Sequence, residues 1–337
     1  MNSPLKKLPP TILKVMTRGL IPKLLVVLGL WGMIGVPVTR LHAQQETLYS
    51  QYMFNRLAVN PAYAGTKGLV SLTALYRMQW VNIDGSPRSF SFTGHGATRN
   101  MRHGFGAMFL RDNLGAQNST VFGVNYAFRI PLDGKSTSNP RRTFLSFGLQ
   151  ANGLQFELDG SKVRTFQSDD PAFGNGSESV LVPDLGAGVF FNTSMFYAGF
   201  SVAHLNEPEV NLFRSEDSRL DRHYFVTAGV DLPLTSDRNY LITPSFFYRG
   251  VRSADAQLDL NLNFMMVQTF WIGAGYRLDD AAIFMAGFYP MKQLRIGYSY
   301  DLTTSTLRSH QNGSHEIMIS YDFGNPNKVR VVTPRYF

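Results

Sequence analysis

The residues that could carry out catalysis are few and lie at scattered positions. Four acidic or His–acid pairs stand out: Asp169–Asp170, Glu207 with Glu209, Asp279–Asp280, and His315–Glu316. Hydrolysis requires a nucleophile beside a base, or two carboxylates that share one site. Neighbouring strand residues point to opposite faces, so adjacent acids on a strand would not share a site. We expect the acids in loops to be solvated, and His315–Glu316, where the last predicted strand begins, to be a hydrogen-bonding pair at the rim. The remaining enzymatic alternative is an outer-membrane hydrolase that uses one of these groups.

Cysteine and the common cofactor motifs are absent from the sequence. With no cysteine and only seven histidines, the chain has no disulfide, no lipid-attachment cysteine and no thiolate metal site. No HExxH, EF-hand, GxSxG, Walker or dinucleotide-binding spacing occurs. The Asp-Gly-Ser and Asn-Gly-Ser sequences are typical of turns. We predict no catalytic residues, no cofactor and no metal.

Residues 1–43 have the pattern of a secretory signal. Five basic residues precede the apolar run Leu24–Val38, which is short for a membrane-spanning helix and contains Gly and Pro. Leu41-His42-Ala43 offers a cleavage site, so we expect Sec-type export with cleavage near Ala43; the alternative is an uncleaved anchor. Without residues 1–43, the chain keeps 26 of its 32 Lys and Arg against 24 Asp and Glu. This near balance argues against a nucleic-acid partner.

Period-two alternation dominates the rest of the chain. In the stretch 257–267, one face carries Leu258, Leu260, Leu262, Phe264 and Met266, and the other carries Gln257, Asp259, Asn261 and Asn263. Stretches 120–131 and 142–153 alternate in the same way, with Gly, Ser, Asn or Gln opposite Phe, Tyr, Leu and Val. An alternating stretch of about ten residues suits a strand that crosses a lipid bilayer.

We expect about fourteen such strands, and an even number is typical of an outer-membrane barrel. Their expected ranges are 69–80, 88–95, 104–111, 120–131, 142–153, 182–192, 195–203, 223–233, 240–249, 257–267, 270–278, 281–288, 293–302 and 314–323. If the N-terminus is periplasmic, the short connections mostly fall on the periplasmic side and the long ones, near 154–181 and 204–222, on the other. The alternative is a secreted β-sandwich, but its solvent-facing positions would carry more charge.

Several motifs resemble the PorP/SprF family of the type IX secretion and gliding machinery of Bacteroidota. They are SQYMFN and NPAYAG within Ser50–Gly65, YRMQW from Tyr76, DGSPRSFSF from Asp84, NYAFRIPL from Asn125, SVAHLNEP from Ser201, QLDLNLNF from Gln257, RIGYSYD from Arg295 and GSHEIMISYDF from Gly313. The matches follow in order over the chain after residue 43. Two positions depart from the family pattern: Arg56 follows Phe54-Asn55 where Pro is common, and Ala203 precedes His204 where Pro is common.

The resemblance implies a non-enzymatic outer-membrane barrel that aids export or surface attachment of cargo proteins. Its implied partners are the lipid bilayer, other type IX secretion components on the periplasmic side, and secreted or adhesin cargo. A passive porin or solute channel is the alternative, because fourteen strands enclose a lumen wide enough for solutes unless something fills it.

The segment 44–68 precedes the first strand and is rich in aromatics and amides. Asn60-Pro61 and Gly65 are turn signals, and Pro makes an extended Asn60 favourable. We expect the segment to pack in the lumen or on the periplasmic rim; the alternative is an exposed partner-docking motif. The candidate contacts are Gln51, Tyr52, Met53, Phe54, Asn55, Asn60, Pro61, Tyr63 and Gly65.

The remaining division places the barrel at 69–323 and a tail at 324–337. The tail is either a short flexible or edge-packed end, or a docking peptide that adds to a partner's sheet edge. Its candidate docking residues are Val331, Pro334, Arg335, Tyr336 and Phe337.

Overall fold

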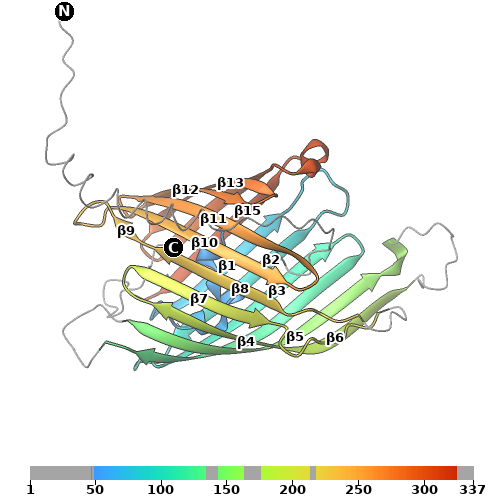
Figure 1. Cartoon of the computed structure of the whole chain (residues 1–337), viewed down its shortest axis with the longest axis horizontal. Helices are drawn as coiled ribbons and strands as arrows, with labels where there is room; N and C mark the ends of the chain where they lie inside the picture. Colours follow the sequence, from blue (N-terminus) through green and yellow to red (C-terminus); the bar gives the residue numbers. More distant parts are fainter. Residues whose placement is uncertain (1–46, 48, 134–142, 163–175, 213–217, 325–337) are drawn as a thin grey trace, which may run out of the picture. The chain divides into compact units, whose positions relative to one another are not determined.

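A single antiparallel sheet closes on itself to form a β-barrel (Figure 1). The computed structural model describes residue 47 and residues 49–133, 143–162, 176–212 and 218–324, which belong to one unit, His42–Phe337. The predicted signal, 1–43, lies outside the described residues. In the described part of the chain, no helix has the length and apolar character needed to span a bilayer.

The barrel is built from fourteen long strands and one short strand. They are β1 Val70–Met78, β2 Arg88–Ala97, β3 His103–Leu114, β4 Gln117–Pro131, β5 Phe144–Asp159, β6 Ser177–Asn192, β7 Phe196–Ala203, β8 His223–Val230, β9 Leu232–Pro233, β10 Tyr240–Val251, β11 Ala254–Met266, β12 Phe270–Arg277, β13 Ala281–Met291, β14 Leu294–Thr303 and β15 Ser314–Phe323. Strands that follow one another in sequence pair as hairpins, except that the two-residue β9 pairs only with β10. Pairing of β1 with β15, from Val70 opposite Phe323 to Met78 opposite His315, closes the ring.

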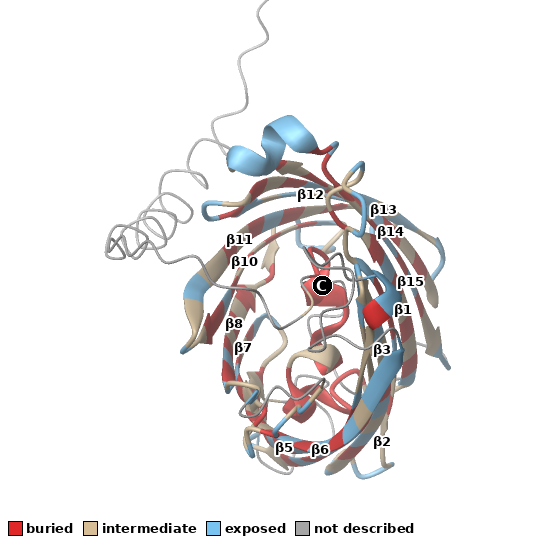
Figure 2. Cartoon of the chain, turned by 90° about the vertical axis from the view of Figure 1, so that its right-hand side faces the viewer, coloured by how far each residue is buried: buried red, intermediate tan, exposed pale blue. Residues whose placement is uncertain are grey.

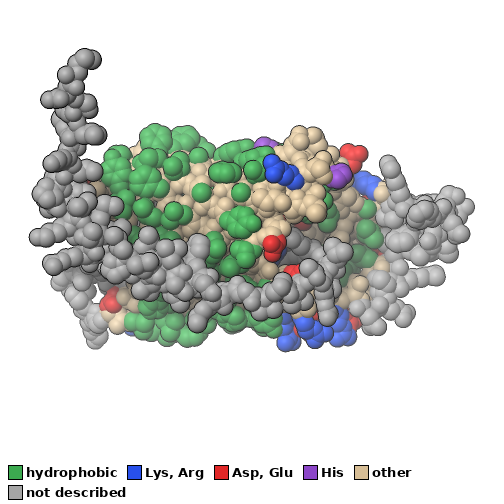
Figure 3. All heavy atoms as spheres, turned by 45° about the horizontal axis from the view of Figure 1, so that its top comes forward, with side chains coloured by type: hydrophobic (Ala, Val, Ile, Leu, Met, Phe, Trp, Pro, Cys, Tyr) green, Lys and Arg blue, Asp and Glu red, His purple; other side chains and the backbone are tan. Residues whose placement is uncertain are grey.

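The alternation in the sequence sorts side chains between the two faces of the wall as predicted. Along β11, Asp259, Asn261, Asn263 and Met265 are buried in the interior, whereas Leu262 on the opposite face is 51% exposed. On β4 and β5, Phe122, Val124, Phe147 and Leu149 are exposed. Figure 3 shows hydrophobic side chains over much of the visible wall. An apolar outer face and a polar inner face suit a wall that contacts lipid.

The connections distinguish the two ends of the barrel. One end, called here the loop-rich end, carries the connections 79–87, 160–176, 204–222 and 304–313 together with three tight hairpins. The other, the turn-rich end, carries 98–102, 132–143, 193–195, 231–239, 267–269 and 292–293, and it is where β1 begins and β15 ends. The long connections therefore gather mainly at one end.

Several strands extend beyond their expected ranges, and β5 and β6 extend the furthest. The expected connection 154–181 is in fact only 160–176, because β5 continues to Asp159 and β6 already begins at Ser177. Hydrogen-bonded pairing continues through Leu154–Val182 to Asp159–Ser177. The outward apolar residues of these strands give way to Gln155 and Ser179, but backbone pairing continues because it does not require apolar side chains.

Candidate functional site in the barrel interior

Residues 49–67, called here the interior segment, thread through the barrel. Figure 2 shows buried ribbon enclosed by the ring of strands. The segment contains three short 3-10 turns, Tyr52–Phe54, Arg56–Ala58 and Pro61–Tyr63. Its first residues contact the loop-rich end of the wall, and its last residues contact the turn-rich end. The segment therefore runs along the length of the lumen.

The turn signals of this segment act locally as expected. Asn60 is extended, with φ −145° and ψ 110°, and its side-chain oxygen accepts the N–H of Ala62 at 2.9 Å. Pro61 occupies the first position of the third turn, where a missing N–H costs nothing. Gly65 has φ +76°, a conformation that favours glycine. These residues turn the chain toward β1.

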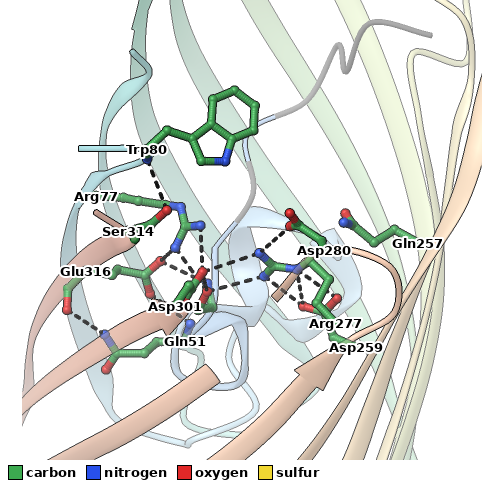
Figure 4. A network of polar contacts seen from close by, with 12 residues as sticks. Gln51, Arg77, Trp80, Gln257, Asp259, Arg277, Asp280, Asp301, Ser314 and Glu316 are labelled. Atoms are coloured by element: carbon green, nitrogen blue, oxygen red, sulfur yellow. Dashed lines mark hydrogen bonds and ion pairs between the residues drawn. The ribbon is translucent and has the colours of Figure 1, made fainter. Parts of the chain in front are cut away.

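At the loop-rich end, five buried charged side chains surround Ser50 (Figure 4). This charged anchor consists of Arg77, Asp259, Arg277, Asp301 and Glu316. The Ser50 hydroxyl donates to Asp301 Oδ2 at 2.6 Å and accepts from Arg77 Nη1 at 3.0 Å and Arg277 Nη2 at 3.3 Å. One small side chain of the interior segment thus completes a network contributed by β1, β11, β12, β14 and β15.

The two arginines of the charged anchor each bridge carboxylates from different strands. Arg77 lies 2.8 Å from Asp301 and 3.3 Å from Glu316. Arg277 lies 2.9 Å from Asp259 and 3.4 Å from Asp301, and Asp280 approaches it at 3.5 Å. Removing one member of a buried pair leaves a charge uncompensated, at a cost of about 3–5 kcal/mol. Each member of the charged anchor therefore depends on the others for charge compensation.

Aromatic residues form the middle of the interior segment. Tyr52 stacks on Phe247 with ring centroids 4.6 Å apart, and its hydroxyl accepts from Asn261 Nδ2 at 3.2 Å. Phe54 packs against Trp271, with ring centroids 4.6 Å apart. Tyr49, Met53 and Phe54 join the inward residues of β10–β13 and β15 in one hydrophobic cluster. Aromatic burial of this kind contributes stabilisation beyond the polar contacts.

Glycines on the inner wall let the interior segment approach the strand backbone. A Cβ on Gly148 would lie 2.1 Å from the backbone nitrogen of Ala62, and one on Gly104 would lie 2.1 Å from the carbonyl oxygen of Ala64. A Cβ on Gly188 would meet Asn60 Oδ1 at 2.3 Å. Wall and segment therefore fit each other closely on the side of β3, β5 and β6.

Near the turn-rich end, the wall holds the segment by hydrogen bonds and an ion pair. His95 Nδ1 accepts the N–H of Gly65 at 3.1 Å, and Arg129 Nη1 donates to the Gly65 carbonyl at 2.7 Å. Lys67 pairs with Asp322 at 3.0 Å. Contacts at both ends and in the middle join this segment to strands around the whole ring.

All nine residues predicted as plug or partner contacts are buried in the interior. Asn55 donates to Ser91 Oγ at 3.1 Å and accepts from Thr93 Oγ1 at 2.6 Å; Asn60 Nδ2 donates to the carbonyls of Val189 at 3.1 Å and Phe200 at 3.3 Å. The predicted tail residues Val331, Pro334, Arg335, Tyr336 and Phe337 lie outside the described residues.

A cavity remains between the interior segment and the wall, toward the loop-rich end. Tyr49, Asp184, His204 and Arg249 are among its lining residues. His204 Nδ1 lies 2.9 Å from Asp184 Oδ1, and Asn152 Nδ2 donates to Asp184 Oδ2 at 2.8 Å. The Asp–His pair ties the residue after β7 to the inner face of β6.

The acidic pairs singled out by sequence do not form a common site where they are described. His315 and Glu316 lie on opposite faces: His315 contacts the Tyr298 hydroxyl at 2.6 Å outside, and Glu316 enters the charged anchor. Glu207 and Glu209 pair with Arg222 and Arg219 in the exposed 204–222 connection. Asp169 and Asp170 lie outside the described residues. Within the described ranges, no group of three His, Cys, Asp or Glu side chains is arranged to hold a metal.

The charged anchor is not evident from the sequence. Each member lies on the inward face of a strand, at or near its loop-rich end. The available sequence signal is a charged residue on a strand face that otherwise carries small or amide side chains. In the sequence, Glu316 stands out only as the neighbour of His315. Nothing in the local pattern indicates that residues 77, 259, 277, 301 and 316 meet Ser50, because ring closure brings them together.

Three solved structures to which the chain is similar match at low identity and with TM-scores below 0.5. Omp33 of Acinetobacter baumannii is 9% identical over 77% of this chain and 100% of its own, with a TM-score of 0.42. The KdgM porin is 10% identical over 76% and 100%, with a TM-score of 0.35. BamA from Haemophilus ducreyi is 8% identical over 76% and 70%, with a TM-score of 0.41.

No curated protein matches the sequence. A family model does: residues 41–321 match the family described as type IX secretion system membrane protein PorP/SprF. The match includes the interior segment and nearly all of the barrel. The chain therefore belongs to the PorP/SprF family of type IX secretion system membrane proteins.

Proposed function

We propose that this protein is a non-enzymatic outer-membrane component of the type IX secretion machinery that aids export or surface attachment of cargo proteins. In this proposal the interior segment closes the lumen, so that the barrel is a platform rather than a pore. The family match supports the secretion role. The contacts of the interior segment support the platform.

The observation that carries the platform proposal is the way in which the segment fills the interior. It bonds to the inner wall from Ser50 at the loop-rich end to Lys67 at the turn-rich end. Buried aromatic residues and close backbone contacts with wall glycines occupy the space between these ends. A solute would have to displace these contacts to cross. A passive porin needs no such structure.

Partners follow from the orientation usual for such barrels. The turn-rich end would face the periplasm and other type IX secretion components, and the loop-rich end would face the cell surface. Cargo would engage the protein during export or attachment. The tail residues 324–337 are a further candidate for periplasmic docking. We also propose Sec-type export with cleavage near Ala43.

Gene deletion tests the secretion role. We expect loss or mislocalisation of a subset of secreted or surface-anchored proteins, with a motility defect in gliding strains. Complementation with the wild-type gene should restore both. If export, attachment and motility are all unchanged in the deletion strain, the proposed secretion role is wrong.

Conductance in planar bilayers tests closure of the lumen. We expect purified wild-type protein to be nearly non-conducting and a variant lacking residues 47–65 to conduct. Heat-modifiable migration on gels should show that both proteins contain a folded barrel. Steady conductance by the wild type, equal to that of the deletion variant, would support the porin alternative instead.

A further inference from the structure

On the outer face of β2–β5, a group of aromatic side chains borders a group of polar side chains. Phe92, Phe109 and Phe122 lie opposite one another on β2, β3 and β4. The Phe109 and Phe122 rings are 5.1 Å apart, and Phe90 approaches Phe109 at 6.2 Å. Phe122 is 56% exposed, as expected of a side chain that faces lipid. We call these four residues the aromatic row, although Phe90 lies one row nearer the loop-rich end than the other three.

Toward the loop-rich end, the next two rows are polar on β3 and β4, whereas Phe90 and Leu181 make the β2 and β6 ends of the first of these rows apolar. Arg111 lies opposite Phe90 on one side and Thr120 on the other, and Thr120 lies opposite Gln155. One row further, Arg88, Asn113 and Asn118 lie opposite one another. We call this surface the polar strip, and its members are Arg88, Arg111, Asn113, Asn118, Thr120 and Gln155. It directly borders the aromatic row.

The two arginines of the polar strip are exposed and close together. Arg88 faces Asn113 across the β2–β3 pair, so Arg111, two residues before Asn113, is its diagonal neighbour at roughly 7–8 Å. Arg111 Nε donates only a long bond, 3.4 Å, to Asn113 Oδ1. Among the described residues neither arginine forms an ion pair within 4.0 Å. The two like charges repel weakly across this distance in water, and an anion bound between them would offset that repulsion.

Acidic groups near the strip are placed so that they leave this pair unneutralised. Glu157 lies opposite Asn118, on β5, and is two strands away from Arg111. Its carboxylate accepts a hydrogen bond from Ser177 Oγ at 3.1 Å. Asp112, between Arg111 and Asn113, belongs to the opposite face and accepts from Ser89 Oγ at 2.5 Å. The outward surface between β2 and β4 is therefore basic and rich in amide donors.

We propose that the polar strip binds the phosphorylated sugar headgroup of an outer-leaflet glycolipid, with its acyl chains on the aromatic row. Guanidinium groups bind phosphate through paired, charge-assisted hydrogen bonds. The amide and hydroxyl side chains supply donors and acceptors for sugar hydroxyls. The position is appropriate because the strip lies where the apolar band ends, toward the loop-rich end, which faces the cell surface in barrels of this kind. Figure 3 shows charged side chains gathered mostly toward that end.

Charge complementarity distinguishes this occupant from others. A neutral lipid would leave Arg88 and Arg111 unpaired, and a soluble anion would make no use of the aromatic row. A partner protein would need to cover both lipid-facing and polar surface. A lipid that carries phosphate on a sugar matches both rows at once. The proposal does not depend on the secretion role, because it uses only the outer wall.

Lipid binding to the full-length protein in detergent, followed by native mass spectrometry, tests the proposal. The probes are bisphosphorylated lipid A, monophosphoryl lipid A and phosphatidylglycerol. We expect lipid A to bind wild-type protein about tenfold more tightly than phosphatidylglycerol, with the monophosphoryl form between them. The variant R88Q/R111Q should bind lipid A about tenfold more weakly than the wild type.

The matched control is R252Q/R308Q, which removes two exposed arginines from connections at the same end. It should change lipid A binding by less than about twofold, because exposed charges away from the strip contribute only weakly. Heat-modifiable migration checks folding, and the single variant R111Q replaces the double variant if the latter fails to insert. Equal binding by R88Q/R111Q and wild type, equal loss in the control, or phosphatidylglycerol binding as tight as lipid A would each overturn the proposal.

Discussion

Glu316 on β15 accepts hydrogen bonds from the backbone of Gln51 and from the residue before it. The N–H of Gln51 lies 2.8 Å from Oε1, and the N–H of Ser50 lies 2.9 Å from Oε2. Gln51 returns a side-chain bond to the Glu316 carbonyl at 3.3 Å. One carboxylate of the wall thus holds two consecutive residues of the interior segment. A substitution at Glu316 can therefore loosen the segment while the paired strands of the barrel stay in place.

Replacing Glu316 by Ala should loosen the start of the interior segment. Two buried N–H groups lose their acceptor, at about 1–3 kcal/mol each, and Arg77 loses one partner. We expect hydrogen exchange at Ser50 and Gln51 to speed up by more than about tenfold. Glu209→Ala, which breaks only an exposed ion pair, is the control and should leave these amides protected. Unchanged exchange in E316A would contradict this account.

Replacing Arg277 by Gln should destabilise the whole charged anchor. The change leaves Asp259 without its principal partner and removes one of the two arginines beside Asp301, so we expect a loss of about 3–5 kcal/mol in unfolding free energy. The second substitution Asp259→Asn in the same chain should recover part of the loss, because it removes the uncompensated charge. Urea unfolding in lipid vesicles measures both. A double variant no more stable than R277Q would argue against a coupled network.

Gly148→Val should displace the interior segment. The new Cβ would clash with the backbone of Ala62, and close-packed interiors tolerate such overpacking poorly. We expect measurable conductance in planar bilayers where the wild type has little. Gly153→Val is the matched control on the same strand: a Cβ there meets only Leu181 Cδ1 at an ordinary 3.6 Å. Conductance in both variants, or in neither, would refute the role assigned to this contact.

Asp231 should make stability depend on pH. Burial raises the pKa of its carboxyl to about 6, while the bond from Thr243 and the charges of Arg56 and Arg238 oppose that rise. Because the folded-state pKa is raised, the stability that the protonated Asp231 contributes is fully present below about pH 3.8 and is lost as pH rises through about 6. Between these two pH values the wild type should lose up to roughly 3 kcal/mol of unfolding free energy that Asp231→Asn does not lose. Parallel stability–pH curves for the two proteins would show that Asp231 is not responsible.

The identity of the lipid-facing residues was predictable because it depends on a local rule. Successive strand residues point to opposite faces, so Leu258, Leu260 and Leu262 share the outer face whichever strands lie beside them. The turn at Asn60-Pro61 was predictable for the same reason, since proline restricts its own φ and the conformation of the residue before it. The ends of β5 and β6 were not, because pairing there continues through polar residues.

Local patterns in the chain are enough to predict a barrel, the faces of its strands and an unusual segment ahead of the first strand. The contacts of that segment are visible only in the folded barrel. Ser50 and Asp301 are 251 positions apart, yet their oxygens lie 2.6 Å from each other. Such a contact depends on strand register and on closure of β1 against β15, which set all inward residues at once. Alternation specifies which side of the wall a residue occupies, but only the closed ring specifies its neighbours across the lumen.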